Sequence, residues 1–161
     1  MAVRNIVKLG LDGADVLSKK CRPVGNMTER MEILLEDLAD TLYESGGVGL
    51  AAPQVGVLRR MAVIDIGDGL IELIDPEIIA TEGEQTGSEG CLSYPDHWGI
   101  VTRPNKVTVR AMDGEGKVRE ITGEGLLARA FCHEIDHLDG HMFTEKVTEW
   151  IEPDSEEYEE E

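Results

Sequence analysis

The chain has 161 residues, of which 41% are hydrophobic and only 4% aromatic, so it can form one domain whose core is filled by aliphatic side chains. Its 33 acidic and 15 basic residues give a net charge of −18 at pH 7, which argues against DNA or an anionic membrane as the main partner. We find no signal peptide and no run of about 20 apolar residues. Three cysteines, an odd and small number, are typical of a reduced, cytoplasmic protein.

The first predicted elements are a short strand over residues 4–9 and an irregular segment that extends to residue 25. Asn26 and Glu29 fit a capping box and predict the start of a helix. Apolar residues then recur at helical spacing as one stripe, and Gly46 and Gly47 end the helix. The members of this stripe are Met31, Leu34, Leu35, Leu38 and Leu42.

The middle of the chain is rich in strand patterns, which are separated by glycine-containing turns. The expected strands cover residues 59–66, 70–74, 77–81, 107–111 and 117–121. A second helix over residues 125–138 is apolar on more than one face and is therefore expected to be buried. Because strands and helices do not alternate regularly, this order favours an α+β fold with antiparallel sheets.

The last ten residues differ in composition from the rest of the chain. Seven of the ten residues from 152 to 161 are acidic. Such a run of like charge is typical of a solvated, disordered tail. We therefore expect one domain over residues 1–151 and a disordered acidic tail over residues 152–161.

The strongest chemical signal lies in the second predicted helix, where residues 133–137 read His-Glu-Ile-Asp-His. Two histidines four residues apart project from one helical face, about 6 Å apart along the axis, which suits two ligands of one metal ion. Glu134 between them would reach a metal-bound water and act as its general base. A chance occurrence of this pattern has a probability on the order of 1%, so a metal site is the better interpretation.

A catalytic metal of this kind takes a third protein ligand and keeps one position open. Cys91 is the best candidate, because a thiolate is a strong ligand and metal binding drives its deprotonation. His141 is a weaker candidate because the helix is expected to end before it, and His97 is expected on the surface. Spacing alone does not decide whether Cys91 is a ligand or a small buried residue. The other cysteines are expected to be packing residues: Cys21 and Cys132.

A third segment, residues 46–54, is uncharged and rich in glycine. Glycine lets a backbone approach a ligand or another segment closely. Taken alone, the segment is slightly better interpreted as a connector between the first helix and the next strand.

These three segments together resemble the peptide deformylase family. The family is marked by G-x-G-L-A-A-x-Q, E-G-C-L-S and H-E-x-D-H segments in this order, which here are residues 47–54, 89–93 and 133–137. The resemblance extends over residues 4–150. It implies antiparallel sheets around the metal-bearing helix, and hydrolysis of the N-formyl group of formylmethionyl nascent peptides with release of formate.

The resemblance also implies roles for individual residues. Glu134 would take a proton from water and pass it to the leaving amine. The side chain of Gln54 and the backbone N–H of Leu92 would donate hydrogen bonds to the formyl oxygen as negative charge develops there. The metal is expected to be Fe(II), with Zn, Ni or Co as substitutes. The family's metal ligands map onto Cys91, His133 and His137.

The substrate is expected to bind as an added strand held by main-chain hydrogen bonds. Leu126 and Ala130 share a helical face with His133, so we expect them to line an apolar pocket for the methionine side chain. Asp136 and Arg103 are expected to form a pair that supports the helix. The residues that match family positions flanking the bound peptide are Val48, Gly49 and Gly90.

Two departures from the family pattern stand near the site. Cys132 replaces a glutamine that often precedes the first metal-binding histidine, and Trp98 replaces a basic residue that some members carry near the exit of the peptide. The second change would alter preference beyond the first substrate residues. Transient proximity to the ribosome is expected, whereas binding to DNA or membranes is not.

Two other functions remain open at this point. A generic H-E-x-x-H zinc endopeptidase would share the helix but would use a different third ligand and a longer cleft. A non-catalytic metal-binding or peptide-binding protein could be built on the same scaffold. The presence of Glu134, Gln54 and Cys91 argues against this second alternative.

Overall fold

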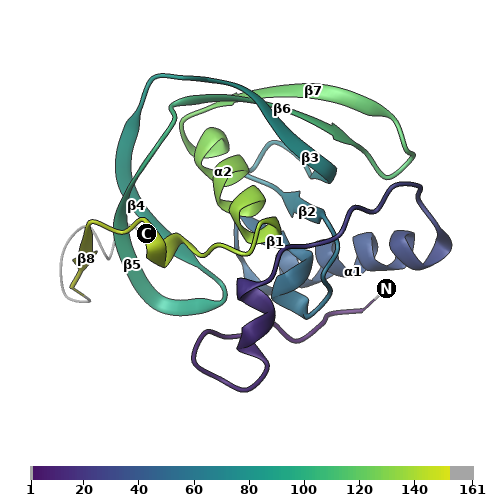
Figure 1. Cartoon of the computed structure of the whole chain (residues 1–161), viewed down its shortest axis with the longest axis horizontal. Coiled ribbons are helices and arrows are strands. Elements are labelled where there is room, and N and C mark those ends of the chain that lie inside the picture. The colour runs from purple at the N-terminus through teal and green to yellow at the C-terminus, as the bar shows by residue number, and fades with distance from the viewer. Residues whose placement is uncertain (1, 153–161) are drawn as a thin grey trace.

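A computed structural model describes residues 2–152 and combines helices with antiparallel sheets, which confirms the predicted α+β class (Figure 1). Its helices are α1 (Glu29–Ser45), α2 (Leu126–Leu138) and the short 3-10 helices η1 (Ala14–Ser18), η2 (Ala52–Val55) and η3 (Phe143–Glu145). Its strands are β1 (Gly49–Ala51), β2 (Met61–Ile64), β3 (Ile71–Glu82), β4 (Gln85–Cys91), β5 (Tyr94–Arg103), β6 (Lys106–Met112), β7 (Val118–Glu124) and β8 (Glu149–Ile151).

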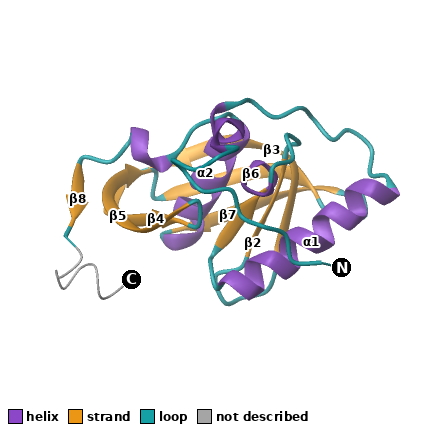
Figure 2. Cartoon of the chain, turned by 90° about the horizontal axis from the view of Figure 1, so that it is seen from below, coloured by secondary structure: helices purple, strands orange, loops and turns teal. Residues whose placement is uncertain are grey.

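Helix α2 lies at the centre of the molecule, with β4 and β5 on one side and the larger sheet on the other (Figure 1). The larger sheet has the strand order β1-β2-β3-β6-β7 and the smaller one β4-β5-β8, and all neighbouring strands are antiparallel. Helix α1 runs along the larger sheet (Figure 2). Strands β1 and β4 are therefore both edge strands within the described part of the chain.

Strand β2 shows why the larger sheet carries a helix on each face. Its residues Ala62 and Ile64 pack in the cluster that contains α2, whereas Met61 and Val63 pack in the cluster that contains α1. Alternate side chains of a strand point to opposite faces of the sheet. A strand covered on both faces must therefore be apolar throughout, and all four residues of β2 are fully buried.

Helix α1 begins two residues later than the sequence predicts. The capping residue is Thr28, whose Oγ1 accepts a hydrogen bond from the N–H of Met31 at 3.3 Å, so the prediction of Asn26 was wrong. Met27 packs against the cluster of α1, which holds residues 26 and 27 outside the helix. The predicted end is confirmed, because Gly46 adopts a left-handed conformation with φ 75° and caps the last turn.

The two short strands expected on either side of Pro76 form one long strand, β3. The pairing of β3 with β6 shifts register between Ile74 and Glu77, and this irregularity accommodates a proline that has no N–H to donate. Asp75 has a φ of 52°, and its carboxylate accepts hydrogen bonds from the backbone of residues 24 and 25 at 2.7 and 2.9 Å. These bonds to a distant segment stabilise the bulge.

Sequence reasoning placed one strand wrongly and missed four. Residues 4–9 are not a strand, because they pair with no strand in the described part of the chain. Strands β1, β4, β5 and β8 were not predicted. Glycines in β1, β4 and β5, and Pro95 in β5, conceal their strand character because both residue types are uncommon in strands.

The acidic tail lies almost wholly outside the described residues, which end at Glu152. Its predicted disorder, and the domain boundary at residue 151, therefore stay predictions. Within residues 2–152, no helix is both long enough and apolar enough to cross a membrane.

Candidate metal centre and active site

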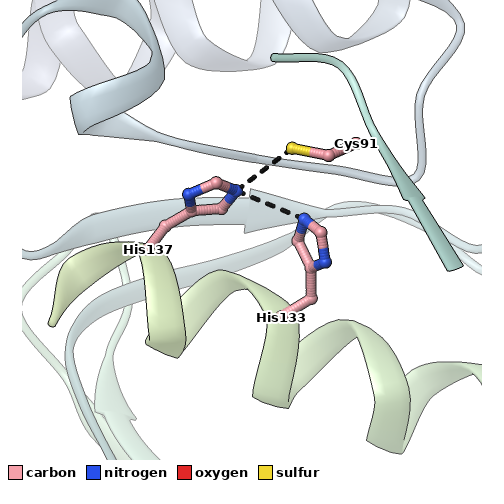
Figure 3. Close-up of side chains that lie close together, drawn as sticks. All are labelled: Cys91, His133 and His137. Carbon is pink, nitrogen blue, oxygen red and sulfur yellow. Dashed lines mark hydrogen bonds between the residues drawn. The ribbon is translucent and has the colours of Figure 1, made fainter. Parts of the chain in front are cut away.

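Helix α2 supplies His133 and His137 to the candidate metal centre, and the end of β4 supplies Cys91 (Figure 3). Nε2 of His137 lies 3.3 Å from Sγ of Cys91 and 3.2 Å from Nε2 of His133. One ligand atom from each residue lies within 4.8 Å of the other two. The helical spacing brings the histidines together, and the β4–β5 hairpin brings the cysteine to them.

The ring of His133 is oriented by Glu89. Oε2 of Glu89 lies 2.6 Å from Nδ1 of His133, and both side chains are at least nine-tenths buried. An ionised carboxylate only accepts hydrogen bonds, so Nδ1 is the nitrogen that carries the proton and donates it. In the neutral form that a metal ligand requires, Nε2 keeps its lone pair, and this nitrogen lies 3.2 Å from Nε2 of His137 on the side of Cys91 (Figure 3).

Glu89 is the centre of a buried ionic network. Arg103 donates to both of its carboxylate oxygens at 3.1 and 2.7 Å, and Nη1 of Arg129 donates at 2.9 Å. Burial raises the pKa of Glu89, but the hydrogen bonds from His133 and Arg103 outweigh burial and hold the pKa below its ordinary value. Nη1 of Arg103 also lies 2.6 Å from Asp136, which confirms the predicted pair.

Glu134 is almost completely buried beside the candidate ligands. The residue is 3% exposed, and its Oε1 atom has no hydrogen-bond partner among the described residues. Burial raises the pKa of its carboxyl to about 7. A side chain added at Gly49 would overlap the Glu134 carboxylate, so this glycine provides the space that the carboxylate occupies. A buried carboxylate with a pKa near neutrality suits a general base.

Gln54 lies in η2, and its side chain contacts Cys91. Its side-chain oxygen accepts the N–H of Ala51 at 3.0 Å, which fixes the orientation of the amide. Its Nε2 donates to Oγ of Ser93 at 3.1 Å and lies 3.5 Å from Sγ of Cys91. The backbone N–H of Leu92, in the turn between β4 and β5, makes no hydrogen bond within residues 2–152. Two donors therefore flank Cys91.

A cavity of about 360 Å³ opens beside these residues. One wall comes from residues 46–49, at and before edge strand β1, and another from residues 88–92, at the end of edge strand β4. Helix α2 contributes further lining residues. Of the residues singled out from the sequence, those that line the cavity are Val48, Gly49, Gly90, Cys91, Leu92, Trp98, Leu126, Ala130, His133 and Glu134.

The residues present fit a divalent transition metal. Two imidazole nitrogens and one thiolate sulfur are a donor set that suits Fe, Zn, Ni or Co. The orientation of His133 by a carboxylate is the outer contact that such ligands usually have. Burial lowers the pKa of His137, and this favours the neutral imidazole that a ligand requires.

Comparison with known protein families matches residues 3–152 to polypeptide deformylase. The chain belongs to the polypeptide deformylase family. A peptide deformylase of Caldanaerobacter subterraneus is 56% identical over 152 residues, 94% of each chain, and one of Lachnoclostridium phytofermentans is 57% identical over 150 residues, 91% of this chain and 90% of the relative. Deformylases of this family remove the N-formyl group from nascent peptides.

Solved deformylase structures share the fold. The peptide deformylase of Legionella pneumophila is 45% identical, covers 91% of this chain and 86% of its own, and superposes with a TM-score of 0.85. The enzyme of Synechococcus elongatus, solved in complex with actinonin, is 35% identical with a TM-score of 0.85 over 89% of this chain and 78% of its own. The family resemblance drawn from three short segments is therefore confirmed over nearly the whole chain.

The remaining histidines and cysteines are not part of the candidate metal-binding group. His141 is exposed and lies 3.1 Å from Glu145, and Nδ1 of His97 lies 2.9 Å from the carbonyl of Pro95. Neither belongs to the metal-binding group found in the described residues. The expected packing roles are also confirmed, because Cys21 and Cys132 are 3% and 6% exposed in the core.

The contacts that Glu89 and Arg129 make beside the candidate metal centre were not predicted from the sequence. Glu89 was quoted only as part of a motif, although a charged residue two positions before the proposed cysteine ligand was a usable signal. Arg129 lies on α2 itself, one turn before His133, and its charge within an otherwise apolar helix indicates a buried partner.

Proposed function

We propose that this chain hydrolyses the N-formyl group of formylmethionyl peptides, and that Cys91, His133 and His137 bind the metal ion that the reaction needs. The convergence of these three ligands beside the buried carboxylate of Glu134 is the observation that carries the proposal. When bound, a divalent ion lowers the pKa of water and polarises the formyl carbonyl.

Glu134 is proposed as the general base and acid. Its carboxylate takes a proton from the attacking water, and the same oxygen atoms later deliver a proton to the peptide nitrogen as the C–N bond breaks. Formate and a free α-amino group are then the products. Its burial supports this role, because a base that is desolvated and has a free oxygen atom is ready to accept a proton.

Gln54 and Leu92 are proposed as the donors that stabilise the negative charge on the formyl oxygen. The amide of Gln54 is already oriented by Ala51 and Ser93, so little reorganisation is needed when the charge develops. The N–H of Leu92 has no other acceptor within the described residues and is free to donate. Removal of one such donor typically costs about 100-fold to 1,000-fold in kcat.

The peptide is proposed to bind between the two edge strands that form the walls of the cavity. Free strand edges offer backbone N–H and C=O groups that hydrogen-bond any peptide sequence. The backbones of Val48, Gly49 and Gly90 are suited to this, and Leu126 and Ala130 provide apolar surface for the methionine side chain. Such an arrangement would accept many nascent chains while selecting their first residue.

We propose that the metal is Fe(II). We further propose that the protein acts in the cytoplasm, in transient proximity to the ribosome. A thiolate ligand and ferrous iron are both sensitive to oxygen and peroxide, which suits a reduced compartment. Zinc, nickel and cobalt would be substitutes. The acidic composition of the chain supports the further proposal that DNA is not a partner.

The test is a formate-release assay on a formylmethionyl tripeptide with anaerobically purified protein, combined with elemental analysis. We expect one equivalent of iron per chain and release of formate. Internal cleavage of an unformylated peptide without formate release would favour an endopeptidase and contradict the proposal. A formyl thioester trapped on Cys91 would contradict its role as a ligand and make it a nucleophile.

A further inference from the structure

The segment of residues 4–9, which is not a strand, makes two hydrogen bonds to the site. The N–H of Val7 donates to the backbone carbonyl of Gln54 at 2.7 Å, and the N–H of Leu9 donates to the carbonyl of Ser93 at 2.7 Å. Residues two apart in an extended chain point to the same side. One short segment thus bonds to η2 and to the turn between β4 and β5.

The two residues that accept these bonds also contact one another beside the proposed ligand. Nε2 of Gln54 donates to Oγ of Ser93 at 3.1 Å and lies 3.5 Å from Sγ of Cys91. Gln54 is 1% exposed and Ser93 is fully buried. A shift of either backbone would therefore move the amide of Gln54 relative to Cys91.

The start of the same segment is anchored on α1. The N–H of Arg4 donates to Oγ1 of Thr41 at 2.9 Å, and Nε of Arg4 lies 2.8 Å from the buried carboxylate of Asp37. Helix α1 is packed firmly against the larger sheet. The segment thus connects helix α1 to η2 and to the turn between β4 and β5, which carry the proposed donors.

We propose that Val7 and Leu9 are positioning residues that set the distance between the two proposed oxyanion donors, the side chain of Gln54 and the N–H of Leu92. One donor lies in η2 and the other in the turn between β4 and β5, and residues 7 and 9 bond to Gln54 itself and to Ser93, the neighbour of Leu92. This inference rests on the donor roles proposed above. A misplacement of about 1 Å in such a site costs up to about 100-fold in rate.

Val7→Pro and Leu9→Pro each remove one of these N–H donors while keeping a backbone that suits an extended segment. The matched control is Asn5→Pro, because the N–H of exposed Asn5 makes no hydrogen bond within the described residues. We expect kcat to fall about 10-fold to 100-fold in the first two variants, with KM and metal content unchanged. The control should keep the kcat of the original chain.

A second set of variants removes single N–H groups without a proline ring. Residues 1–20 can be synthesised and ligated to a chain that begins at Cys21, which gives the full protein with an ester in place of one chosen amide. Esters at Val7 or Leu9 should lower kcat and leave KM and metal content unchanged. The matched control is an ester at Ile6, whose N–H makes no hydrogen bond in residues 2–152.

Unchanged kcat in the ester variants at Val7 and Leu9 would overturn the inference. An equal loss of kcat in the Ile6 ester, or a loss of metal content that accounts for the lower rate, would also overturn it, because the segment would then be merely structural. If the original chain releases no formate at all, the proposed function itself fails. If the original chain releases formate and the esters at Val7 and Leu9 leave kcat unchanged, only the positioning role is refuted.

Discussion

Oε2 of Glu89 lies 2.6 Å from Nδ1 of His133, and the same carboxylate accepts hydrogen bonds from two buried arginines. One side chain thus orients a proposed metal ligand and neutralises positive charge that α2 and β5 carry into the interior. The candidate metal centre and the buried ion pairs of the core therefore share a single carboxylate. Substitutions at residue 89 should affect both together.

Glu89→Gln should weaken metal binding and destabilise the fold. The amide oxygen can still accept the proton of His133, but the negative charge that balances Arg103 and Arg129 is lost. We expect metal affinity to fall about 10-fold to 100-fold, and the free energy of unfolding to fall by about 3 kcal/mol. Metal titration with a competing chelator and urea unfolding of the metal-free protein measure the two effects separately.

The matched control for residue 89 is Glu77→Gln. Glu77 also pairs with an arginine, Arg110, at 3.5 Å, but both side chains are about half or more exposed. Exposed pairs contribute about 1 kcal/mol or less, so neither stability nor metal affinity should change appreciably. Equal effects of the two substitutions would contradict the coupling between Glu89 and the metal centre.

Glu134→Gln should strongly reduce turnover and preserve the metal. The amide keeps the size of the side chain in its pocket but does not accept a proton from water. We expect kcat to fall about 100-fold to 10,000-fold, while elemental analysis finds the same metal content as in the original chain. Retention of most of the activity would show that another group is the base.

Gly49→Ala tests whether the space beside β1 is reserved for Glu134. A Cβ atom at residue 49 would overlap the carboxylate of Glu134, so either the proposed base or strand β1 must shift. We expect kcat to fall about 10-fold or more with little change in metal content. In the control Gly87→Ala, the added Cβ lies an ordinary 3.6 Å from Arg129, and kcat should stay unchanged. Equal kinetics of the two variants would refute the steric argument.

The parts of the site that follow from helical geometry could be predicted from the sequence. His133, Glu134 and His137 lie within five residues, so the period of the helix alone decides how they are arranged. Cys91 and Glu89 approach from β4, and their partners on α2 are 46 and 44 residues away in the chain. Spacing has no bearing on such contacts, which depend on how the hairpin packs against the helix. The family resemblance supplied Cys91, but the role of Glu89 emerged only from the structure.

The errors in the fold arose where distant contacts outweigh local preference. Asn26 and Thr28 are both good capping residues, and the packing of Met27 decides between them. Residues 4–9 have a strand-like composition, but their N–H groups bond to Thr41, Gln54 and Ser93, which lie on separate elements. Pro76 looks like the end of a strand, yet a bulge stabilised by Asp75 lets β3 continue. The capping residue, the conformation of residues 4–9 and the continuation of β3 could not be predicted from neighbouring residues in the sequence.

Ala130→Phe should impair the recognition of methionine more than the chemistry. Ala130 is 6% exposed and lines the cavity one turn before His133, so a phenyl ring there would occupy the volume proposed for the methionine side chain. The contribution of a buried methionine side chain is about 1.5 to 3 kcal/mol, so kcat/KM for a formylmethionyl peptide should fall about 10-fold to 100-fold.

A formylalanyl peptide, which lacks that side chain, is the matched control substrate and should be hydrolysed at nearly the same kcat/KM as before. Elemental analysis should find an unchanged metal content. An equal loss of kcat/KM for both peptides would indicate general damage to the site and would remove Ala130 from the methionine pocket.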